Sequence, residues 1–254
     1  MSPNELLARH LKTAVKVARN NVVRSNELTA RTRQFLAEKG YLREVIKGWY
    51  LLAPPGVRSG ETALWHGNFW SFLSEYLKDR FDRDYCLAAE ASLDLWGGKT
   101  QTPPQVTVIT KRGGVGKTDL AFGTSLMIYR DEPRFPEEPG DFEGLNVMPP
   151  AMALAKVSAT YFKKDDVTAQ IVLRGTSAAD LARELLRWGK VPSANRIVGA
   201  LNAMGEAAKA VDVRKTLNAA GLNVEPENPF EDYAVFLSAE IPTVSPYAGR
   251  IHLL

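Results

Sequence analysis

The sequence predicts an α+β protein in which a basic N-terminal part precedes a mixed α/β body with a helical C-terminal part. Three observations lead to this prediction. Helical apolar spacing and β-prone runs are interspersed up to about residue 149, and helical spacing alone follows. The segment at residues 53–60, Ala-Pro-Pro-Gly-Val-Arg-Ser-Gly, has the composition of a linker. The net charge changes sign near this segment, so we expect two domains, residues 1–58 and residues 59–254.

The composition is typical of a globular protein. Of the 254 residues, 45% are hydrophobic and 24% are charged, which is enough for a core without a disulfide or a structural metal. Cys86 is the single cysteine, which excludes an intramolecular disulfide and a cysteine zinc site. Charged residues interrupt the N-terminus, unlike in a signal peptide, and no run of about 18 apolar residues occurs. We therefore expect a cytoplasmic protein with no membrane partner.

The N-terminal domain is predicted to begin with two helices of unequal length. Ser2 and Glu5 are spaced as in a capping box, and an apolar stripe at three- and four-residue steps follows them. A short β-prone run comes next, after which Ser25 can cap a second helix. A long helix followed by a short one is therefore expected.

A third helix and a hairpin complete this domain. Thr29 or Ala30 can begin the third helix, and Gly40 is the residue type usually found just past a helix end. Lys47 and Gly48 then form a turn between two β-prone arms, as in a β-hairpin. The order helix, short helix, helix and hairpin is that of a winged helix-turn-helix domain.

The distribution of charge favours a polyanionic partner for this domain. Residues 1–58 hold 11 Lys and Arg against four acidic residues, a net charge of +7, whereas the rest of the chain holds 21 against 25, a net charge of −4. A recognition helix places its N-terminal side chains at base edges, where Arg and Gln form bidentate contacts with guanine and adenine. We therefore predict binding to double-stranded DNA; a winged helix that binds only protein is the alternative.

The predicted DNA contacts divide into two groups. The major groove would receive Arg31, Arg33 and Gln34, with Thr32 at a base or a phosphate. The DNA backbone would be contacted by Arg24, Arg43 and Lys47, the last from the tip of the wing.

The body is predicted to combine helices with two strands. Aromatic residues at helical spacing predict a helix over residues 61–81, and residues 85–96 predict another. Cys86 would lie in this second helix as an inert buried thiol. Residues 105–110 and 124–129 are β-prone runs that predict strands.

Helical patterns fill the C-terminal part of the body. A pair of prolines, Pro149 and Pro150, precedes the first of these patterns, and Gly221 follows the last. The predicted helices cover residues 151–162, 178–188, 194–210 and 212–220, the third of them capped by Ser193.

The segment Lys-Arg-Gly-Gly-Val-Gly-Lys-Thr at residues 111–118 resembles the phosphate-binding loop of ParA-like partition ATPases. In such a loop backbone N–H groups cradle phosphates, Lys117 would reach the β- and γ-phosphates and Thr118 would hold magnesium. The loop should also open a long helix, but here Gly123 and a β-branched run soon follow. We therefore favour a glycine-rich loop between two antiparallel strands, with a nucleotide-binding switch at residues 113–118 as the less favoured interpretation.

No catalytic constellation stands out in the sequence. His10, His66 and His252 are scattered and lack metal-ligand spacing. Glu90 and Asp94 are four residues apart and share a helix face, where a structural role is expected. We therefore predict no enzymatic activity, no cofactor and no metal site.

Several segments carry a resemblance to a known family. In the pattern of this family, residues 35–42 (Phe-Leu-Ala-Glu-Lys-Gly-Tyr-Leu) correspond to the end of a helix and the strand that follows it. Residues 47–50 (Lys-Gly-Trp-Tyr) correspond to its wing. Residues 85–97, 104–110 and 148–155 match an alanine-rich helix, a strand and a proline-led helix. These segments resemble the AbiEi-type antitoxin family, the antitoxins and transcriptional regulators of type IV toxin–antitoxin pairs.

The resemblance covers about residues 22–175. It implies a winged helix that binds and represses the protein's own promoter, and a body that antagonises a cognate nucleotidyltransferase-like toxin. Residues 236–254 are similar to the segment that leads into the catalytic domain of Fic-type AMP-transferases, although the histidine-containing Fic motif is absent. The alternative is a regulatory or interaction module for a toxin or such a transferase, without DNA binding.

Overall fold

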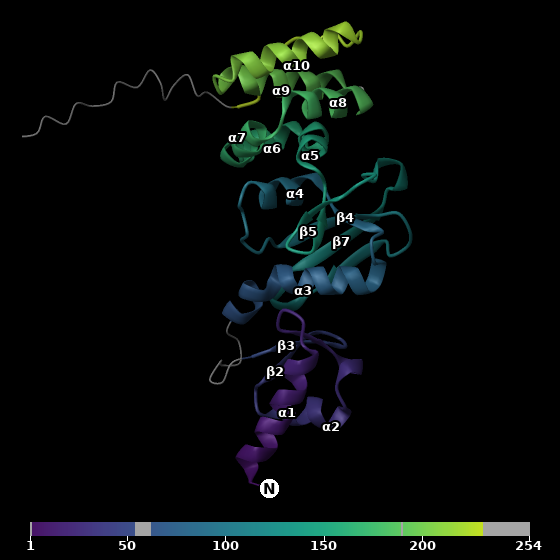
Figure 1. The fold of residues 1–254 in the computed structure, drawn as a ribbon, viewed down its shortest axis with the longest axis vertical. Helices are drawn as coiled ribbons and strands as arrows, with labels where there is room; N and C mark the ends of the chain where they lie inside the picture. The colour runs from purple at the N-terminus through teal and green to yellow at the C-terminus, as the bar shows by residue number, and fades with distance from the viewer. Residues whose placement is uncertain (1, 54–61, 189, 231–254) are drawn as a thin grey trace, which may run out of the picture.

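The computed structural model describes residues 2–53, 62–188 and 190–230. This part of the chain is an elongated mixed α/β protein, so the predicted α+β class is confirmed (Figure 1). Along the long axis, a small N-terminal unit is followed by a sheet with helices on both faces and then by a stack of helices. The predicted linker falls largely outside the described residues, and the segment at residues 236–254 falls wholly outside them.

The N-terminal unit contains two helices, a 3-10 turn and a small sheet. Its elements are α1 (Pro3–Val17), β1 (Val22–Arg24), η1 (Ser25–Glu27), α2 (Ala30–Glu38), β2 (Leu42–Ile46) and β3 (Trp49–Leu52). The antiparallel sheet has the strand order β1-β3-β2. The short second helix predicted at Ser25 is thus a single 3-10 turn.

Local capping explains where the two helices begin. The Ser2 hydroxyl accepts a hydrogen bond from the Glu5 backbone N–H at 3.2 Å, and the Glu5 carboxylate accepts one from the Ser2 N–H at 2.7 Å. This is the predicted capping box of α1. The Thr29 hydroxyl accepts from the Thr32 N–H at the start of α2, and Gly40 adopts a φ of +76° just after its end.

The small sheet has packing partners on both faces. α1 and α2 cover one face, where Ala14, Leu36 and Leu42 pack together. The other face packs on α3 (Ala63–Phe81), because Val22 and Leu51 join the cluster that surrounds the aromatic side chains of that helix. The N-terminal unit and the body therefore share a core across α3 (Figure 1).

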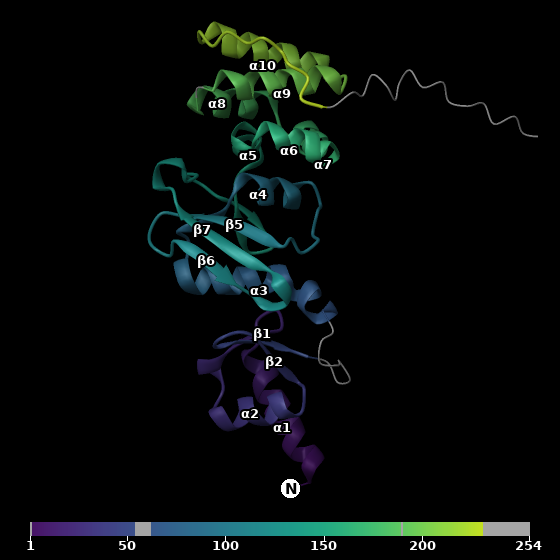
Figure 2. The ribbon, with the colours of Figure 1, turned by 180° about the vertical axis from the view of Figure 1, so that it is seen from behind.

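The body is built on a six-stranded mixed sheet. Its strands are β4 (Tyr85–Leu87), β5 (Gln105–Thr110), β6 (Gly116–Asp119), β7 (Ser125–Arg130), β8 (Gly140–Phe142) and β9 (Leu145–Val147), in the order β6-β7-β5-β4-β9-β8. Pairs β5–β7 and β4–β9 are parallel, and the other pairs are antiparallel. α3 covers one face and α4 (Ala89–Trp96) the other (Figure 2).

The prediction of one helix over residues 85–96 is wrong in its first part. Residues 85–87 form the central strand β4, and the chain turns at Ala88 into α4. Tyr85 and Leu87 pack toward α3, whereas Cys86 packs into the opposite core. A short apolar run buried on both faces has no helical or strand period, which is why its sequence was compatible with a helix.

The predicted antiparallel pairing of the two central strands is also wrong. β5 and β7 lie side by side in parallel, from the pair Gln105–Ser125 to the pair Thr110–Arg130. The intervening segment reverses direction as β6, which pairs antiparallel with β7 at the edge of the sheet. The hairpin β6–β7 thus lets β7 run parallel to β5 without a crossover helix.

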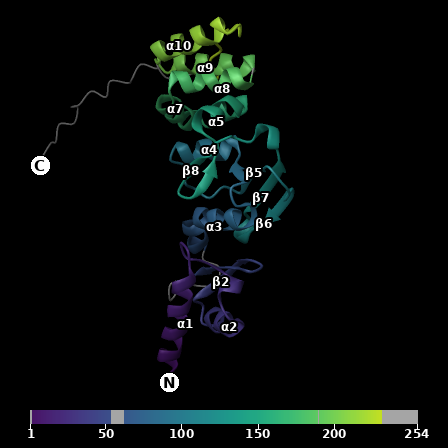
Figure 3. The same ribbon diagram turned by 45° about the vertical axis from the view of Figure 1, so that its right-hand side comes forward.

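The C-terminal part is a stack of short helices (Figure 3). They are α5 (Pro150–Lys156), α6 (Ala159–Lys164), α7 (Asp166–Gly175), α8 (Ala178–Trp188), α9 (Val191–Ala203) and α10 (Ala207–Ala219). The helix predicted over residues 151–162 is broken into α5 and α6. The one predicted over residues 194–210 begins earlier and stops at Ala203, before Gly205 takes a φ of +77°.

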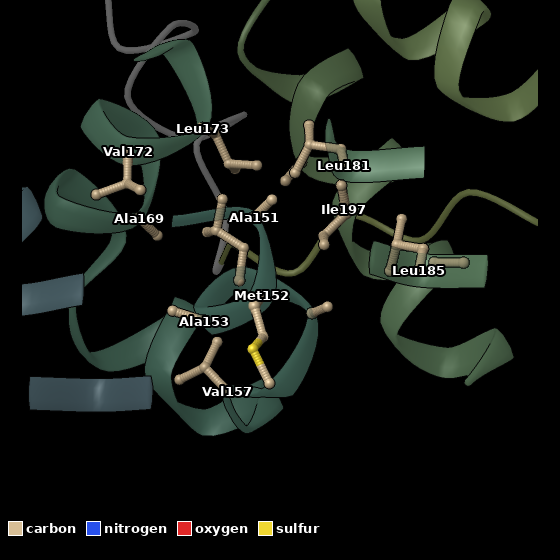
Figure 4. Close-up of a cluster of buried hydrophobic side chains, with 14 of the residues drawn as sticks. Ala151, Met152, Ala153, Val157, Ala169, Val172, Leu173, Leu181, Leu185 and Ile197 are labelled. Carbon is tan, nitrogen blue, oxygen red and sulfur yellow. The ribbon is translucent and has the colours of Figure 1, made fainter. Parts of the chain in front are cut away.

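Small and branched apolar residues hold this stack together. Figure 4 shows Ala151 and Met152 of α5 surrounded by Leu173 of α7, Leu181 of α8 and Ile197 of α9. Close packing of short helices requires such small contact residues, since bulkier ones would push the axes apart. Among the described residues, no helix is long and apolar enough to span a membrane.

Candidate nucleic-acid interface

The outer face of α2 presents two of the predicted DNA contacts together. Arg31, Gln34 and Glu38 are exposed and recur at the three- and four-residue steps of one helix face. The Gln34 side-chain amide donates to the Glu38 carboxylate at 2.9 Å. Because the small sheet separates α2 from α3, this face lies at the end of the molecule farthest from the helical stack (Figure 1).

Thr32 does not belong to this face, which corrects its predicted role as a DNA contact. Its side chain is 5% exposed, and its hydroxyl lies 3.0 Å from His10 Nδ1 and accepts from the Thr29 hydroxyl at the same distance. His10 in turn packs against Phe35, with ring centroids 4.8 Å apart. Thr32 therefore joins α1 to α2 inside the unit and is not available to a base or a phosphate.

Arg33 is also used within the protein. Its Nη1 donates to the backbone carbonyl oxygens of Ser25 and Leu28, the latter at 2.7 Å. These carbonyls lie in and just after the turn η1, whose orphan acceptors need partners. The Arg33 guanidinium therefore binds backbone carbonyls at the junction between η1 and α2. This internal contact replaces its predicted place in the major groove.

Arg24 connects the N-terminal unit to the body. Its guanidinium forms ion pairs with Asp79 of α3 and, at 3.5 Å, with Glu27, and it lies 6.0 Å from the ring centre of Trp49. Trp49 itself packs edge-on against Phe72 of α3. The predicted contact of Arg24 with the DNA backbone is therefore replaced by a contact with α3.

Part of the basic character of the N-terminal unit is neutralised in the same way. Arg19 lies 3.8 Å from the carboxylate of Glu27 and 4.0 Å from that of Glu75 on α3. These groups, with Arg24 and Asp79, line a cavity of about 480 Å³ between the unit and α3. The charge asymmetry of the sequence thus reflects an internal interface as well as an external surface.

The remaining two predicted contacts lie on the hairpin. Arg43 is half-buried in β2, opposite Leu51. Lys47 is exposed at the turn, where Gly48 adopts a φ of +86°. The neighbouring Trp49 packs on α3, so the turn lies on the α3 side of the unit and not beside the outer face of α2.

Three exposed cations of α1 were missed as candidates. Arg9, Lys12 and Lys16 are exposed, recur at three- and four-residue steps, and have no ion-pair partner among the described residues. α1 packs on α2 through His10, and the three cations lie on the side of α1 that faces away from this contact. Their spacing, with the apolar stripe on the opposite side, was the available signal.

The phosphate-loop likeness has a different geometry from a phosphate site. Residues 116–119 form the edge strand β6, and the next element is the three-residue turn η2 (Ala121–Gly123). In the described part of the chain, this segment does not lead into an α-helix whose N-terminus could bind a phosphate. The Lys117 ammonium instead pairs with the Asp119 carboxylate at 2.7 Å. Residues 116–119 are therefore an edge strand of the sheet, and not part of a loop between two antiparallel strands as the sequence predicted.

Comparison with known proteins informs the fold alone. The crystal structure of the RV2827C protein from Mycobacterium tuberculosis superposes on this chain with a TM-score of 0.51. The two share 16% sequence identity, and the alignment covers 85% of this chain and 82% of that one. No protein-family model matches the sequence, and no curated protein matches it.

Proposed function

We propose that the N-terminal unit is a winged helix that binds double-stranded DNA, and that the chain is a transcriptional regulator of its own promoter. The observation that carries this proposal is the exposed outer face of α2, where Arg31 and Gln34 lie together at the free end of the molecule. The order α1, η1, α2 and the hairpin β2–β3 supports the same domain type.

On this proposal the contacts differ from those that the sequence predicted. Arg31 and Gln34 read base edges, because both side chains can make bidentate hydrogen bonds in the major groove. Lys12 and Lys16 of α1 bind phosphates and supply affinity without sequence preference. The predicted contact of Lys47 is not part of this proposal, because its turn lies on the α3 side of the unit. Arg24, Thr32 and Arg33 are engaged within the protein, by α3, α1 and the turn η1 respectively.

The body, in the same proposal, is the antitoxin part that antagonises a nucleotidyltransferase-like toxin. Its support is the sequence resemblance over about residues 22–175, which includes β4, α4 and β5. Co-production with the product of the neighbouring gene tests this part. Rescue of growth together with a co-purifying complex would support it, whereas continued toxicity with no complex would contradict it.

A protein-interaction module without DNA binding is the second candidate function. It is favoured by the exposed sheet edge at β6, because an edge strand presents unpaired backbone groups to another chain. Val115, Phe122 and Tyr129, close to this edge in sequence and sheet register, are 66%, 48% and 49% exposed. In this candidate function the β6 edge binds a partner chain, and the N-terminal unit binds no nucleic acid.

Substitutions on α2 and in the body distinguish the two candidates. Arg31→Ala is expected to weaken binding to the chain's own upstream DNA by about 1–3 kcal/mol and to relax its sequence preference. Lys215→Ala is the matched control, since Lys215 is an exposed cation on α10 at the opposite end of the molecule. Equal affinity of both variants and wild type for DNA would contradict an interface on α2.

A further inference from the structure

A small cavity in the body is lined by charged side chains that have no role in the proposed DNA binding. It has a volume of about 210 Å³ and lies where α4, α5 and the end of α8 meet the sheet. Its apolar lining comes from Ala89, Ile109 and Met148, and an indole ring, that of Trp188, forms another wall. The polar lining consists of Asp131, Arg134, Lys156 and Lys190.

The charges that line this cavity are unbalanced. Three cations, Arg134, Lys156 and Lys190, stand against the single carboxylate of Asp131, which leaves two positive charges in excess. Asp131 lies 3.7 Å from Arg134, and no described carboxylate lies within ion-pair distance of Lys156 or Lys190. Nearby Arg187 is already paired with Glu137 at 2.7 Å and adds no further excess.

Lys156 is held at the centre of this group. Its ammonium donates to the Arg134 backbone carbonyl at 2.9 Å and lies 3.6 Å from the ring centre of Trp188. Burial, together with the positive charges of Arg134, Lys190 and Arg187, lowers its pKa to about 8 although Asp131 opposes the shift. A bound anion would relieve this repulsion and stabilise the charged lysine.

We infer that this cavity binds a small phosphate monoester whose organic part packs against Trp188. The excess of two positive charges matches a phosphate monoester, which carries about −1.5 to −2 charges at neutral pH, better than a carboxylate, which carries one. Lys156 and Lys190 act as point charges for the phosphate, and Arg134 offers a bidentate donor. The apolar lining and the indole wall leave room for an organic group beside the phosphate.

Calorimetric titration of the full chain with three probes at matched ionic strength tests the inference. Phenyl phosphate is expected to bind at one site, and benzoate, with the same ring but one charge, is expected to bind at least about tenfold more weakly. Inorganic phosphate separates a monoester site from a site for the free ion, and it is expected to bind more weakly than phenyl phosphate. Equal binding of inorganic phosphate and phenyl phosphate, or of benzoate and phenyl phosphate, would overturn the assignment.

Two variants and one control locate the site. Lys156→Met keeps the length and the apolar stem of the side chain, and Arg134→Gln changes an exposed residue, so both variants are expected to fold. Each is expected to weaken phenyl phosphate binding about tenfold, because each removes a charged hydrogen-bond donor. Lys215→Met on α10 should bind like wild type, and the same affinity in all three variants would refute this location.

A chemical readout follows the lysine itself. A lysine with a lowered pKa has more free amine at pH 8 than ordinary lysines and reacts faster with acetic anhydride. Phenyl phosphate is expected to slow acetylation of Lys156, mapped by peptide mass spectrometry, and to leave Lys215 unaffected. Acetylation of Lys156 that is insensitive to saturating phenyl phosphate would contradict a ligand at this position.

Discussion

At the residue scale, Arg31 and Arg33 show how two neighbouring arginines on one helix take different roles. Arg31 is exposed on the outer face of α2. Arg33 turns toward η1 and donates to the carbonyls of Ser25 and Leu28. A helix rotates by about 100° per residue, so residues two apart lie on nearly opposite sides. Position on the helix, and not residue type, separates the exposed arginine from the structural one.

We predict opposite consequences for the two alanine variants. Arg33→Ala leaves the Ser25 and Leu28 carbonyls without their donor and should lower the free energy of unfolding by about 1–3 kcal/mol. Arg31→Ala should change that free energy by less than about 0.5 kcal/mol, as is usual for exposed residues. Urea unfolding measures both values. An Arg33→Ala variant as stable as Arg31→Ala would show that the carbonyl contacts contribute nothing.

The stability of the protein is also expected to depend on the titration of Lys156. Its pKa is lowered from 10.5 to about 8 in the folded state, so between these values the unfolded chain binds more protons than the folded one. The contribution of Lys156 to the free energy of unfolding therefore rises with pH from about 8 to 10.5. Below pH 8 the lysine is charged in both states, and the destabilisation from its buried charge no longer changes with pH.

The difference between Lys156→Met and wild type isolates this effect from other titrating groups. Because methionine takes up no proton, the stability of the variant relative to wild type should fall as pH rises from about 8 to 10. Urea unfolding at pH 7, 8, 9 and 10 gives the comparison. A difference that is independent of pH would show that Lys156 has an ordinary pKa in the folded protein.

At the element scale, α9 depends on a close approach between two backbones. A Cβ atom at Gly199 would lie 1.9 Å from the carbonyl oxygen of Glu227. The segment around Glu227 is held on α9 by the hydrogen bond from the Glu227 N–H to the Asn195 carbonyl at 3.0 Å. Asn195 also accepts from the Glu225 N–H through its side chain. The glycine therefore lets the segment after α10 lie directly on α9.

Substitution at Gly199 is expected to reverse the usual effect of alanine in a helix. Alanine normally stabilises a helix interior by roughly 0.5–1 kcal/mol relative to glycine. Gly199→Ala should instead destabilise the protein, because the obstructing atoms are backbone and the segment must move away. Gly175→Ala at the end of α7 is the matched control, since nothing lies within 4 Å of its Cβ position. Thermal unfolding should show a lower Tm for Gly199→Ala alone.

Elements with local signals were predictable from the sequence, and elements fixed by tertiary pairing were not. Ser2 and Glu5 identify the start of α1, and Gly40 marks the end of α2, because capping depends on nearby residues alone. The strand β4 lacks such a signal, since its three residues are buried on both faces. The parallel pairing of β5 with β7 depends on contacts between residues 20 apart in sequence.

The sequence indicates which helix carries the candidate site, but not which of its side chains are exposed. The sequence placed basic and amide side chains on one short helix, but it could not show which of them are buried. The Thr32 side chain contacts His10 of α1, which is 22 residues away in the sequence. The Arg24 side chain pairs with Asp79, which is 55 residues away. Such long-range partners decide exposure and leave no local pattern.

At the scale of the whole molecule, the N-terminal unit and the body are joined through α3. The small sheet packs on the aromatic side of α3, and Arg19 and Arg24 pair with its carboxylates. The outer face of α2 is left exposed at one end of the molecule. The cavity at Lys156 and Trp188 lies on the other face of the large sheet from α3, because Ile109 and Met148 in its lining belong to the core of the helical stack. This arrangement places the two proposed binding sites on opposite sides of α3.

Binding of the purified chain to its own upstream DNA and to a scrambled duplex, across a series of salt concentrations, tests the central proposal most directly. The account predicts selective binding of the upstream DNA and an affinity that falls with salt, because Lys12 and Lys16 would each displace counterions. Absent binding, or equal binding of both duplexes, would contradict it and leave the protein-interaction role of the body as the explanation.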